Sequence, residues 1–295
     1  MRGFAARVAN LWIGRKQPSS TAAVLSAARA AVADKQPAVV ITGGSRGIGA
    51  ALAHVFAANG HSVMIVARDT QKLETASANI RSATGQSILA LACDITAPDA
   101  VKQIEAALDK AGQYLDVLVN NAAIGLSGPF ENQSPADFDH LIALNITAVT
   151  QLTRHALPAM RARRRGGILN VASLGAYSPG PNQALYYASK AFVVSLTEAI
   201  AAECAGHGVR IAAIIPGPAD TDFHANMGAS DARYRLLLPS LSAERVAKAG
   251  YRGFILGQKI IVPGLLTRPA LVALRLLPHA ITVPLVSWLL ARPHQ

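Results

Sequence analysis

The chain has 295 residues, of which 51% are hydrophobic, 15% charged and only 5% aromatic. Such an apolar composition excludes an intrinsically disordered protein, because the chain buries enough surface to offset the entropy lost on folding. The formal net charge of +11 lies in the two ends: residues 1–36 carry +5, residues 245–295 carry +7 and the middle carries −1. A near-neutral middle argues against a nucleic-acid-binding protein, whose basic surface is expected on the functional body.

Seven short apolar segments are predicted to be strands: residues 38–42, 62–67, 87–92, 116–120, 168–172, 209–215 and 259–262. Most are continuous apolar runs, as is typical of parallel strands buried on both faces. Helical segments lie between them, and the first, from Ile48 to Asn59, ends at Gly60. This alternation predicts one α/β domain over residues 37–262, a doubly wound parallel sheet with helices on both faces. Cys93 and Cys204 lie within apolar segments, which indicates buried thiols rather than a disulfide.

The first predicted strand leads directly into a glycine-rich turn that runs from Thr42 to Gly49 and opens a helix. Glycines at 43, 47 and 49 let the backbone turn tightly and approach a pyrophosphate. The amino terminus of the helix then places free N–H groups and a positive dipole end against the phosphates. The position of the turn between a strand and a helix favours a dinucleotide site over a merely tight turn.

Arg68 follows the second predicted strand, where the ribose of a dinucleotide would lie. An acidic residue there would accept from a ribose 2′-OH, whereas a guanidinium suits a 2′-phosphate. Arg46 adds a second positive charge from within the glycine turn. NADP(H) is therefore favoured over NAD(H), with Arg68 as an ordinary surface residue being the alternative. No metal site is expected.

Ser173 follows the fifth predicted strand, and Tyr186 comes thirteen residues later, with Lys190 four residues beyond it. Positions i and i+4 share one face of a helix, so an ammonium beside the phenol would lower the pKa of Tyr186. A phenol tuned in this way exchanges a proton with a carbonyl or alcohol oxygen, which Ser173 would hold by a hydrogen bond. A tyrosine and a lysine at this spacing are also common by chance.

Together, these motifs resemble the short-chain dehydrogenase/reductase family over residues 37–262. The resemblance is carried by the glycine turn, Asn120-Asn121-Ala122-Ala123, Asn145, Ser173, Tyr186 to Lys190, and Pro216-Gly217 through Thr221. It implies a single Rossmann-type domain with a seven-stranded parallel sheet that moves a hydride between NAD(P)H and a carbonyl or carbinol carbon. Two positions depart from the family pattern: Ala123 stands where a glycine is usual, and Ala172 where a second serine is frequent.

The resemblance also implies a role for each site residue. Tyr186 is the acid/base, Ser173 positions the substrate oxygen, and Lys190 lowers the pKa of Tyr186 and holds the nicotinamide ribose. Asn145 supports a water-linked proton path, Asp94 contacts the adenine, and Asn120 stabilises the central strand. The full set expected at the cofactor is Thr42, Gly43, Ser45, Arg46, Gly47, Ile48, Gly49, Arg68, Asp94, Asn120, Ala122, Tyr186, Lys190, Pro216, Gly217 and Thr221.

The two ends are expected to be helical extensions of the catalytic domain. Residues 1–36 are basic and fit a packed helix, a membrane-surface helix or a transit-like presequence. Residues 263–295 are apolar but interrupted by arginines and prolines, and their longest charge-free stretch, 276–291, is too short for a convincing membrane span. These short helices suit the substrate cleft, oligomer contacts or a membrane interface.

The sequence therefore predicts an NADP(H)-dependent carbonyl reductase or alcohol dehydrogenase for a small hydrophobic, lipid-like substrate. Apolar residues expected beside the cleft, Ile124, Leu126, Leu174 and Leu185, support that substrate class. We expect a cytoplasmic homo-oligomer with peripheral membrane contact through its termini and no nucleic-acid partner. The alternative is a noncatalytic NADP-binding or membrane-associated scaffold with the same fold.

Overall fold

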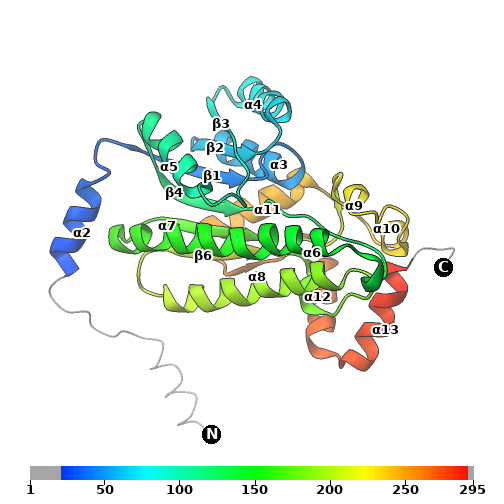
Figure 1. The fold of residues 1–295 in the computed structure, drawn as a ribbon. Coiled ribbons are helices and arrows are strands. Elements are labelled where there is room, and N and C mark those ends of the chain that lie inside the picture. The colour runs from blue at the N-terminus through cyan, green and yellow to red at the C-terminus, as the bar shows by residue number, and fades with distance from the viewer. Residues whose placement is uncertain (1–20, 292–295) are drawn as a thin grey trace, which may run out of the picture.

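In the computed structural model, which describes residues 21–291, seven parallel strands form one sheet in the order β3-β2-β1-β4-β5-β6-β9 (Figure 1). The strands are β1 (Gln36–Thr42), β2 (Ser62–Ala67), β3 (Ile88–Ala92), β4 (Gln113–Asn120), β5 (Gly167–Val171), β6 (Arg210–Ile214) and β9 (Ile260–Ile261). All seven predicted strands are present, and their ends differ from the predicted ends by at most three residues. The predicted doubly wound, Rossmann-type sheet is confirmed.

Successive residues of β1 face opposite sides of the sheet and supply two separate cores. Val39 and Ile41 pack with side chains of α3 (Gly47–Ala58), α4 (Thr70–Thr84) and α11 (Ala243–Ile255). Ala38 and Val40 pack with side chains of α5 (Ala100–Lys110), α7 (Val149–Arg163) and α8 (Ala184–Glu203). Helices therefore cover both faces, and both β1 sets are almost fully buried. This burial explains why the strands read as continuous apolar runs.

The carboxyl ends of the strands meet at one edge of the sheet, where the irregular segments gather. These are η1 (Phe130–Asn132), α6 (Pro135–Ile142), η3 (Leu174–Tyr177), α9 (Phe223–Asn226) and α10 (Arg233–Leu237). Two short strands that were not predicted, β7 (Ala219–Asp220) and β8 (Leu241–Ser242), pair in parallel and anchor the loop between them. This loop, residues 219–242, is called the substrate loop below.

Both ends of the described chain are helical, as expected. Helix α2 (Thr21–Ala30) lies against α7, and Arg29 Nε donates to the Arg163 carbonyl oxygen at 3.4 Å (Figure 1). Residues 1–20, which carry most of the predicted basic extension, lie outside the described residues. At the other end, α12 (Thr267–Leu276) and α13 (His279–Leu290) lie beside η3 and α10. Among the helices within 21–291, none is long and apolar enough to cross a membrane.

Candidate functional site

A cavity of about 390 Å³ opens at the carboxyl edge of the sheet. It runs from the glycine turn and the end of β2 to Ser173, Tyr186 and Lys190. Most of the predicted site residues line it: Gly43, Ser45, Arg46, Gly47, Ile48, Arg68, Asp94, Ala122, Ser173, Tyr186, Lys190, Pro216, Gly217 and Thr221. Site residues as far apart in the sequence as Gly43 and Thr221 therefore meet in one cavity.

The glycine turn is as tight as its glycines allow. A Cβ at Gly49 would lie 2.2 Å from the Gly43 carbonyl oxygen, and Gly43 itself has a φ of +64°. Gly47 also has a positive φ, and a Cβ there would contact Thr221 of the substrate loop. Helix α3 begins directly after Arg46 with no side chain capping its first N–H groups. These free donors face the cavity at the positive end of the helix dipole, as a phosphate group requires.

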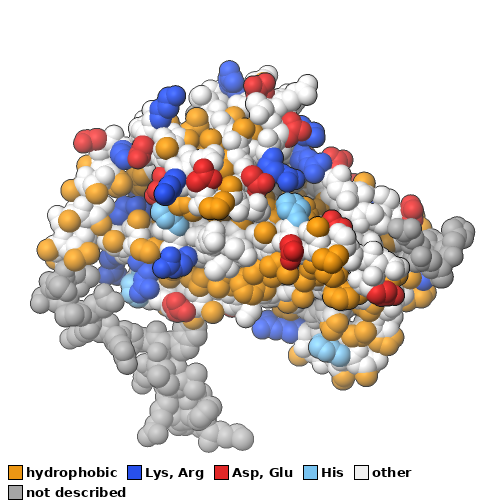
Figure 2. Space-filling model, in the orientation of Figure 1, with side chains coloured by type: hydrophobic (Ala, Val, Ile, Leu, Met, Phe, Trp, Pro, Cys, Tyr) orange, Lys and Arg blue, Asp and Glu red, His pale blue; other side chains and the backbone are white. Residues whose placement is uncertain are grey.

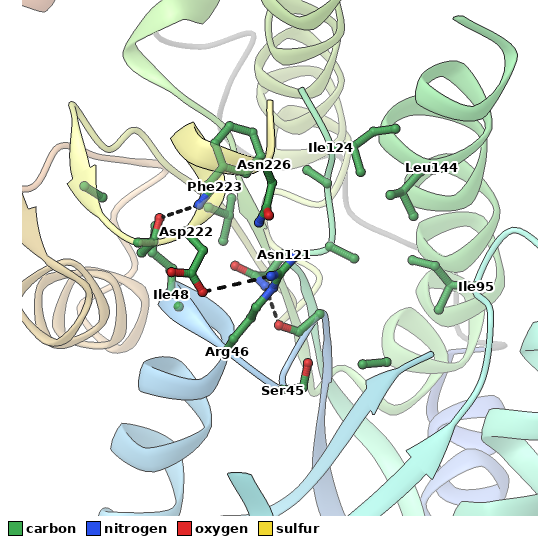
Figure 3. Close-up of a pocket in the computed structure, with 18 of the residues that line it drawn as sticks. Ser45, Arg46, Ile48, Ile95, Asn121, Ile124, Leu144, Asp222, Phe223 and Asn226 are labelled. Atoms are coloured by element: carbon green, nitrogen blue, oxygen red, sulfur yellow. Dashed lines mark hydrogen bonds and ion pairs between the residues drawn. The ribbon is translucent and has the colours of Figure 1, made fainter. Parts of the chain in front are cut away.

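Thr42 lies behind the cavity wall and joins β1 to the loop after β4. Its hydroxyl accepts from the backbone N–H groups of Asn121 and Ala122, both at 3.1 Å. The Asn121 amide in turn donates to the carbonyl oxygens of Thr42 and Gly43, at 3.0 and 3.1 Å. Figure 3 shows Asn121 on the cavity wall. Asn121, which was not among the predicted site residues, therefore holds the glycine turn against the loop after β4.

Asn120 lies deeper still and does not line the cavity. Its amide donates to Asn170 Oδ1 at 2.8 Å, and the Asn170 amide donates to Thr197 at 2.8 Å. This buried chain ties β4 to β5 and α8. Two roles were expected of Asn120, stabilising the central strand and binding the cofactor. Its hydrogen bonds fit the first role, and its position behind the cavity wall gives no support to the second.

Three basic residues line the cavity: Arg68 directly after β2, Lys72 in α4 and Arg46 in the glycine turn. Asp69 caps α4 by accepting from the Lys72 backbone N–H at 3.0 Å, and it pairs with Lys72 Nζ at 2.8 Å. Asp94 accepts from both the N–H and the hydroxyl of Thr96. Burial opposes ionisation of Asp94, but these bonds and the nearby Arg68 charge hold its pKa below the ordinary value.

Tyr186, rather than its neighbour Tyr187, lines the cavity. The ring of Tyr187 instead packs over Gly180, where an added Cβ would approach it to 2.4 Å. Burial raises the pKa of the Tyr186 phenol well above its ordinary value, and a hydrogen bond with Ser173 partly offsets that rise. Ser173 Oγ also accepts from the Gly175 N–H at 3.1 Å, which orients the serine at the start of η3.

Lys190 is almost fully buried, and its Nζ lies 5.8 Å from the centre of the Tyr186 ring. The ammonium donates to the Val171 carbonyl oxygen at 2.9 Å. Burial lowers the pKa of Lys190 to about 8. The expected lowering of the Tyr186 pKa by Lys190 does not dominate, because desolvation of the phenol outweighs the other influences on it.

Asn145 contacts helix α8 through buried hydrogen bonds and does not line the cavity. It lies in a π-helical turn, η2 (Ala143–Ala148), a local irregularity often found at functional sites. Its amide donates to the Ile124 carbonyl oxygen at 2.8 Å and to Ser189 Oγ at 3.1 Å, and its Oδ1 accepts from the Ile124 N–H. Ser189 donates to the Tyr186 carbonyl oxygen at 2.7 Å, so Asn145 acts on Tyr186 through Ser189.

The substrate loop adds residues that sequence reasoning missed. Arg46 Nη1 and Asp222 Oδ2 lie 4.0 Å apart (Figure 3). Phe223 and Asn226 also line the cavity. The Phe223 ring lies 5.4 Å from that of Tyr186. His224 also lines the cavity, and its Nδ1 lies 2.6 Å from the Tyr234 hydroxyl. Residues 219–238 have no regular apolar period, so no pattern could have placed them.

Four apolar residues were predicted beside the cleft, and one of them, Ile124, lines the cavity (Figure 3). Leu126 and Leu185 lie one layer behind, in an apolar cluster around Tyr186 and Met227. Leu174 packs instead with the cluster that contains Val193 and Leu271. The wall next to Tyr186 is thus apolar, with Ile124 and Phe223 facing the space.

The residues present fit a nicotinamide dinucleotide. The glycine turn leaves space that a Cβ would fill, the uncapped helix terminus faces that space, and the opposite end holds a phenol and a serine hydroxyl. Among the described residues, no group of three or more His, Cys, Asp or Glu is arranged to hold a metal ion.

Comparison with known proteins agrees with this geometry. A family model described as short chain dehydrogenase matches residues 37–232. The chain is 31% identical to serine 3-dehydrogenase of Agrobacterium fabrum, over 72% of this chain and 86% of that protein. It is 35% identical both to a short-chain dehydrogenase of Pseudocercospora fijiensis and to very-long-chain 3-oxoacyl-CoA reductase-B of Danio rerio. The matches cover 63% and 60% of this chain but only 60% and 58% of those two proteins.

Two solved structures extend the comparison. A short-chain dehydrogenase from Sphingobium yanoikuyae in complex with NADPH has a TM-score of 0.71 and 31% identity, over 78% of this chain and 88% of that one. A 3-ketoacyl-(acyl-carrier-protein) reductase from Brucella melitensis complexed with NADH has a TM-score of 0.69 and 32% identity, over 77% and 96%. Both similarities are well above the level at which only the fold is shared.

Proposed function

The chain belongs to the short-chain dehydrogenase family, and we propose that it is an NADP(H)-dependent reductase of hydrophobic carbonyl compounds. Membership places it among nicotinamide-dependent oxidoreductases acting on small molecules. The observation that carries the proposal is the meeting of Tyr186, Ser173 and Lys190 at one end of a cavity whose other end is the glycine turn. We assign catalysis to residues 37–262 and localisation to the two ends.

The bound nicotinamide would supply or accept the hydride. The phenol of Tyr186, whose pKa burial raises further, carries its proton at neutral pH and can donate it to a carbonyl oxygen in the cavity. Ser173 hydrogen-bonds the same phenol and would orient the substrate oxygen next to it. Lys190, largely protonated below its pKa of about 8, holds positive charge near the phenol ring and favours the phenolate that remains.

Replacement of Tyr186 tests catalysis, with Tyr187 as the matched control. Tyr186→Phe removes the proton donor, so kcat for NADPH oxidation should fall by about 10²–10⁴-fold, while NADPH binding measured by fluorescence changes little. Tyr187→Phe removes a hydroxyl outside the cavity and should keep kcat within about threefold. A noncatalytic scaffold would oxidise NADPH at the same background rate in both variants, and that result would overturn the proposal.

The preference for NADP(H) rests on Arg68. It lies on the cavity wall at the end of β2, and the two carboxylates nearby, Asp69 and Asp94, are engaged by Lys72 and Thr96. A guanidinium with engaged carboxylates around it suits a 2′-phosphate better than a 2′-OH. Arg68→Ala should raise the KM for NADPH about 10–100-fold and leave that for NADH within about twofold. The exposed Arg81, on α4, provides the control. Equal KM values for both cofactors in the unmodified protein would refute the preference.

The hydrophobic substrate class is supported by the apolar wall of Ile124 and Phe223 next to Tyr186. A relative of similar sequence is named as a reductase of very-long-chain 3-oxoacyl-CoA, a lipid carbonyl. A panel in which long-chain ketones turn over no faster than small polar ones would contradict this assignment. We also propose a peripheral membrane contact through the ends. The homo-oligomer and the cytoplasmic location stay predictions.

A further inference from the structure

Helix α13 is apolar on every side, but the described part of the chain, residues 21–291, covers only one of its faces. Thr282, Val286 and Leu290 form a buried stripe, of which Val286 and Leu290 pack with Ala232 and Tyr234 of the substrate loop. Ile281, Leu285 and Trp288 form a second stripe and are each about half exposed. A helix that is apolar all round is normally buried all round. The apolar side chains of the second stripe are therefore more exposed to solvent than is usual for such a helix.

Exposed apolar side chains continue from α13 onto its neighbours. Among residues 21–291, seventeen large hydrophobic side chains are exposed, and eight of them lie between Leu265 and Trp288. Leu265 is 89% exposed and Leu276 is 77% exposed. Leu236, Leu237 and Leu238 add three more at the end of α10, next to α13. We call these eleven residues the tail surface. Figure 2 shows orange side chains on the lobe at the lower right, where α12 and α13 lie in Figure 1. Scattered exposed leucines are ordinary, but such a concentration marks an interaction site.

The tail surface carries only positive charge along the C-terminal helices. From residue 245 to the end of the sequence there is no aspartate or glutamate, and Arg268 and Arg275 lie in α12 itself. Arg233 stacks its guanidinium over the Trp288 ring at 5.4 Å and donates to the Trp288 carbonyl oxygen at 3.2 Å. Long basic side chains beside apolar ones suit a surface that offers hydrocarbon and anionic phosphate together.

We propose that the tail surface docks on an anionic lipid bilayer, with α12 and α13 lying along the membrane interface. This inference deepens the membrane contact proposed above by naming the surface and the lipid charge it requires. Helices of ten and twelve residues are about 15 and 18 Å long, which suits a position along an interface. A second copy of the chain is a poorer occupant, because a two-fold contact would bring the arginines of α12 against those of the partner helix, and α12 and α13 carry no acidic residue.

Docking at this place brings the bilayer to the substrate loop. Helix α13 binds α10 directly, and the backbone N–H of Arg233 donates to the Ala291 carbonyl oxygen at 3.1 Å. The same loop forms part of the cavity wall through Phe223 and His224. A lipid-like carbonyl compound leaving the membrane would therefore enter beside the substrate loop without crossing bulk water.

Vesicle flotation with the full chain tests the docking. The unmodified protein should float with vesicles of phosphatidylcholine plus phosphatidylserine, and less with phosphatidylcholine alone or at high salt. The triple variant I281S/L285S/W288S should lose at least about tenfold in binding to the anionic vesicles. The control variant I255S/L256S changes two exposed apolar residues at the C-terminal end of α11, within the catalytic domain, and should bind as the unmodified protein does.

Two further measurements separate the outcomes. Thermal melting confirms that both variants fold, and sedimentation without lipid reports the oligomeric state. Binding to phosphatidylcholine alone as strong as to the anionic vesicles, or equal flotation of the tail variant and the control, overturns the docking. If the unmodified protein never floats and the tail variant loses self-association, the tail surface is a contact with a second copy, and the membrane docking is overturned as well. NADPH oxidation of a short water-soluble ketone tests the chemistry separately, so a protein that floats without oxidising NADPH keeps the docking and loses the reductase proposal.

Discussion

Replacing Lys190 with methionine should make the protein more stable at neutral pH although it removes a residue of the proposed active site. Burial lowers the pKa of Lys190 from 10.5 to about 8, so the folded protein holds this ammonium at a cost. Each pKa unit is worth about 1.36 kcal/mol, which makes the cost about 3 kcal/mol below pH 8. Methionine loses the 2.9 Å hydrogen bond to Val171, worth about 1 kcal/mol. The expected net gain is about 2 kcal/mol, or about 4 °C in Tm.

The pH dependence of this gain distinguishes the cause. Between about pH 8 and pH 10.5 the unfolded chain binds a proton that the folded chain has released, so the unmodified protein gains stability as the pH rises through that window. The advantage of Lys190→Met should therefore shrink from about pH 7 to pH 10 and vanish at the upper end. Differential scanning calorimetry without cofactor measures it, with the exposed Lys102→Met as control. A Lys190→Met variant that is less stable than the unmodified protein at pH 7 would refute the reasoning. A difference in Tm that stays the same across this pH range would refute it as well.

Three other substitutions test separate parts of the site. Gly49→Ala places a Cβ 2.2 Å from the Gly43 carbonyl oxygen, so it should lower the free energy of unfolding in urea by about 3 kcal/mol and weaken NADPH binding. The control Gly60→Ala has open space around it and should lower that free energy by about 1 kcal/mol. Equal losses in the two variants would contradict the tight turn. Asn145→Ala leaves buried backbone groups unpaired and should cost about 2–3 kcal/mol and lower kcat, so unchanged kcat would remove its positioning role. Burial, aided by the charge of Arg235, lowers the pKa of His224 to about 4. The protein should therefore lose stability as the pH falls from about 6.5 to 4, and the His224→Gln variant should lose less. Equal decreases in Tm with acid for the two proteins would contradict this.

The sheet could be predicted because buried parallel strands and the turns after them leave strong local signals. All seven strands appear where apolar runs were found, and the glycine turn lies where the spacing of its glycines indicated. The shared cavity of Ser173, Tyr186 and Lys190 was expected from the family resemblance, because a tyrosine and a lysine at that spacing are also common by chance. Such features depend on a few neighbouring residues, which is why one sequence suffices.

The substrate loop could not be predicted, because its shape depends on contacts that are distant in the sequence. His224 reaches the cavity only because Tyr234 and α13 hold the loop in place, and neither contact follows an apolar period. The π-helical turn at Asn145 likewise has no signature in the residues around it. Tyr186 shows a third limit: its spacing from Lys190 suggested a lowered pKa, whereas the pKa is raised because the phenol itself is deeply buried.

The alternation of β1 between two cores has a consequence for how this protein tolerates change in its sequence. Inserting one residue after Ala38 would turn Val39 and Ile41 toward α5 and α7, and would turn Val40 toward α3. The same insertion would displace Thr42, whose hydroxyl fixes the loop that carries Asn121 and Ala122. Stability and cofactor binding would therefore be lost in one event. Surface loops accept added residues, but this strand must keep its length for the enzyme to fold or to work.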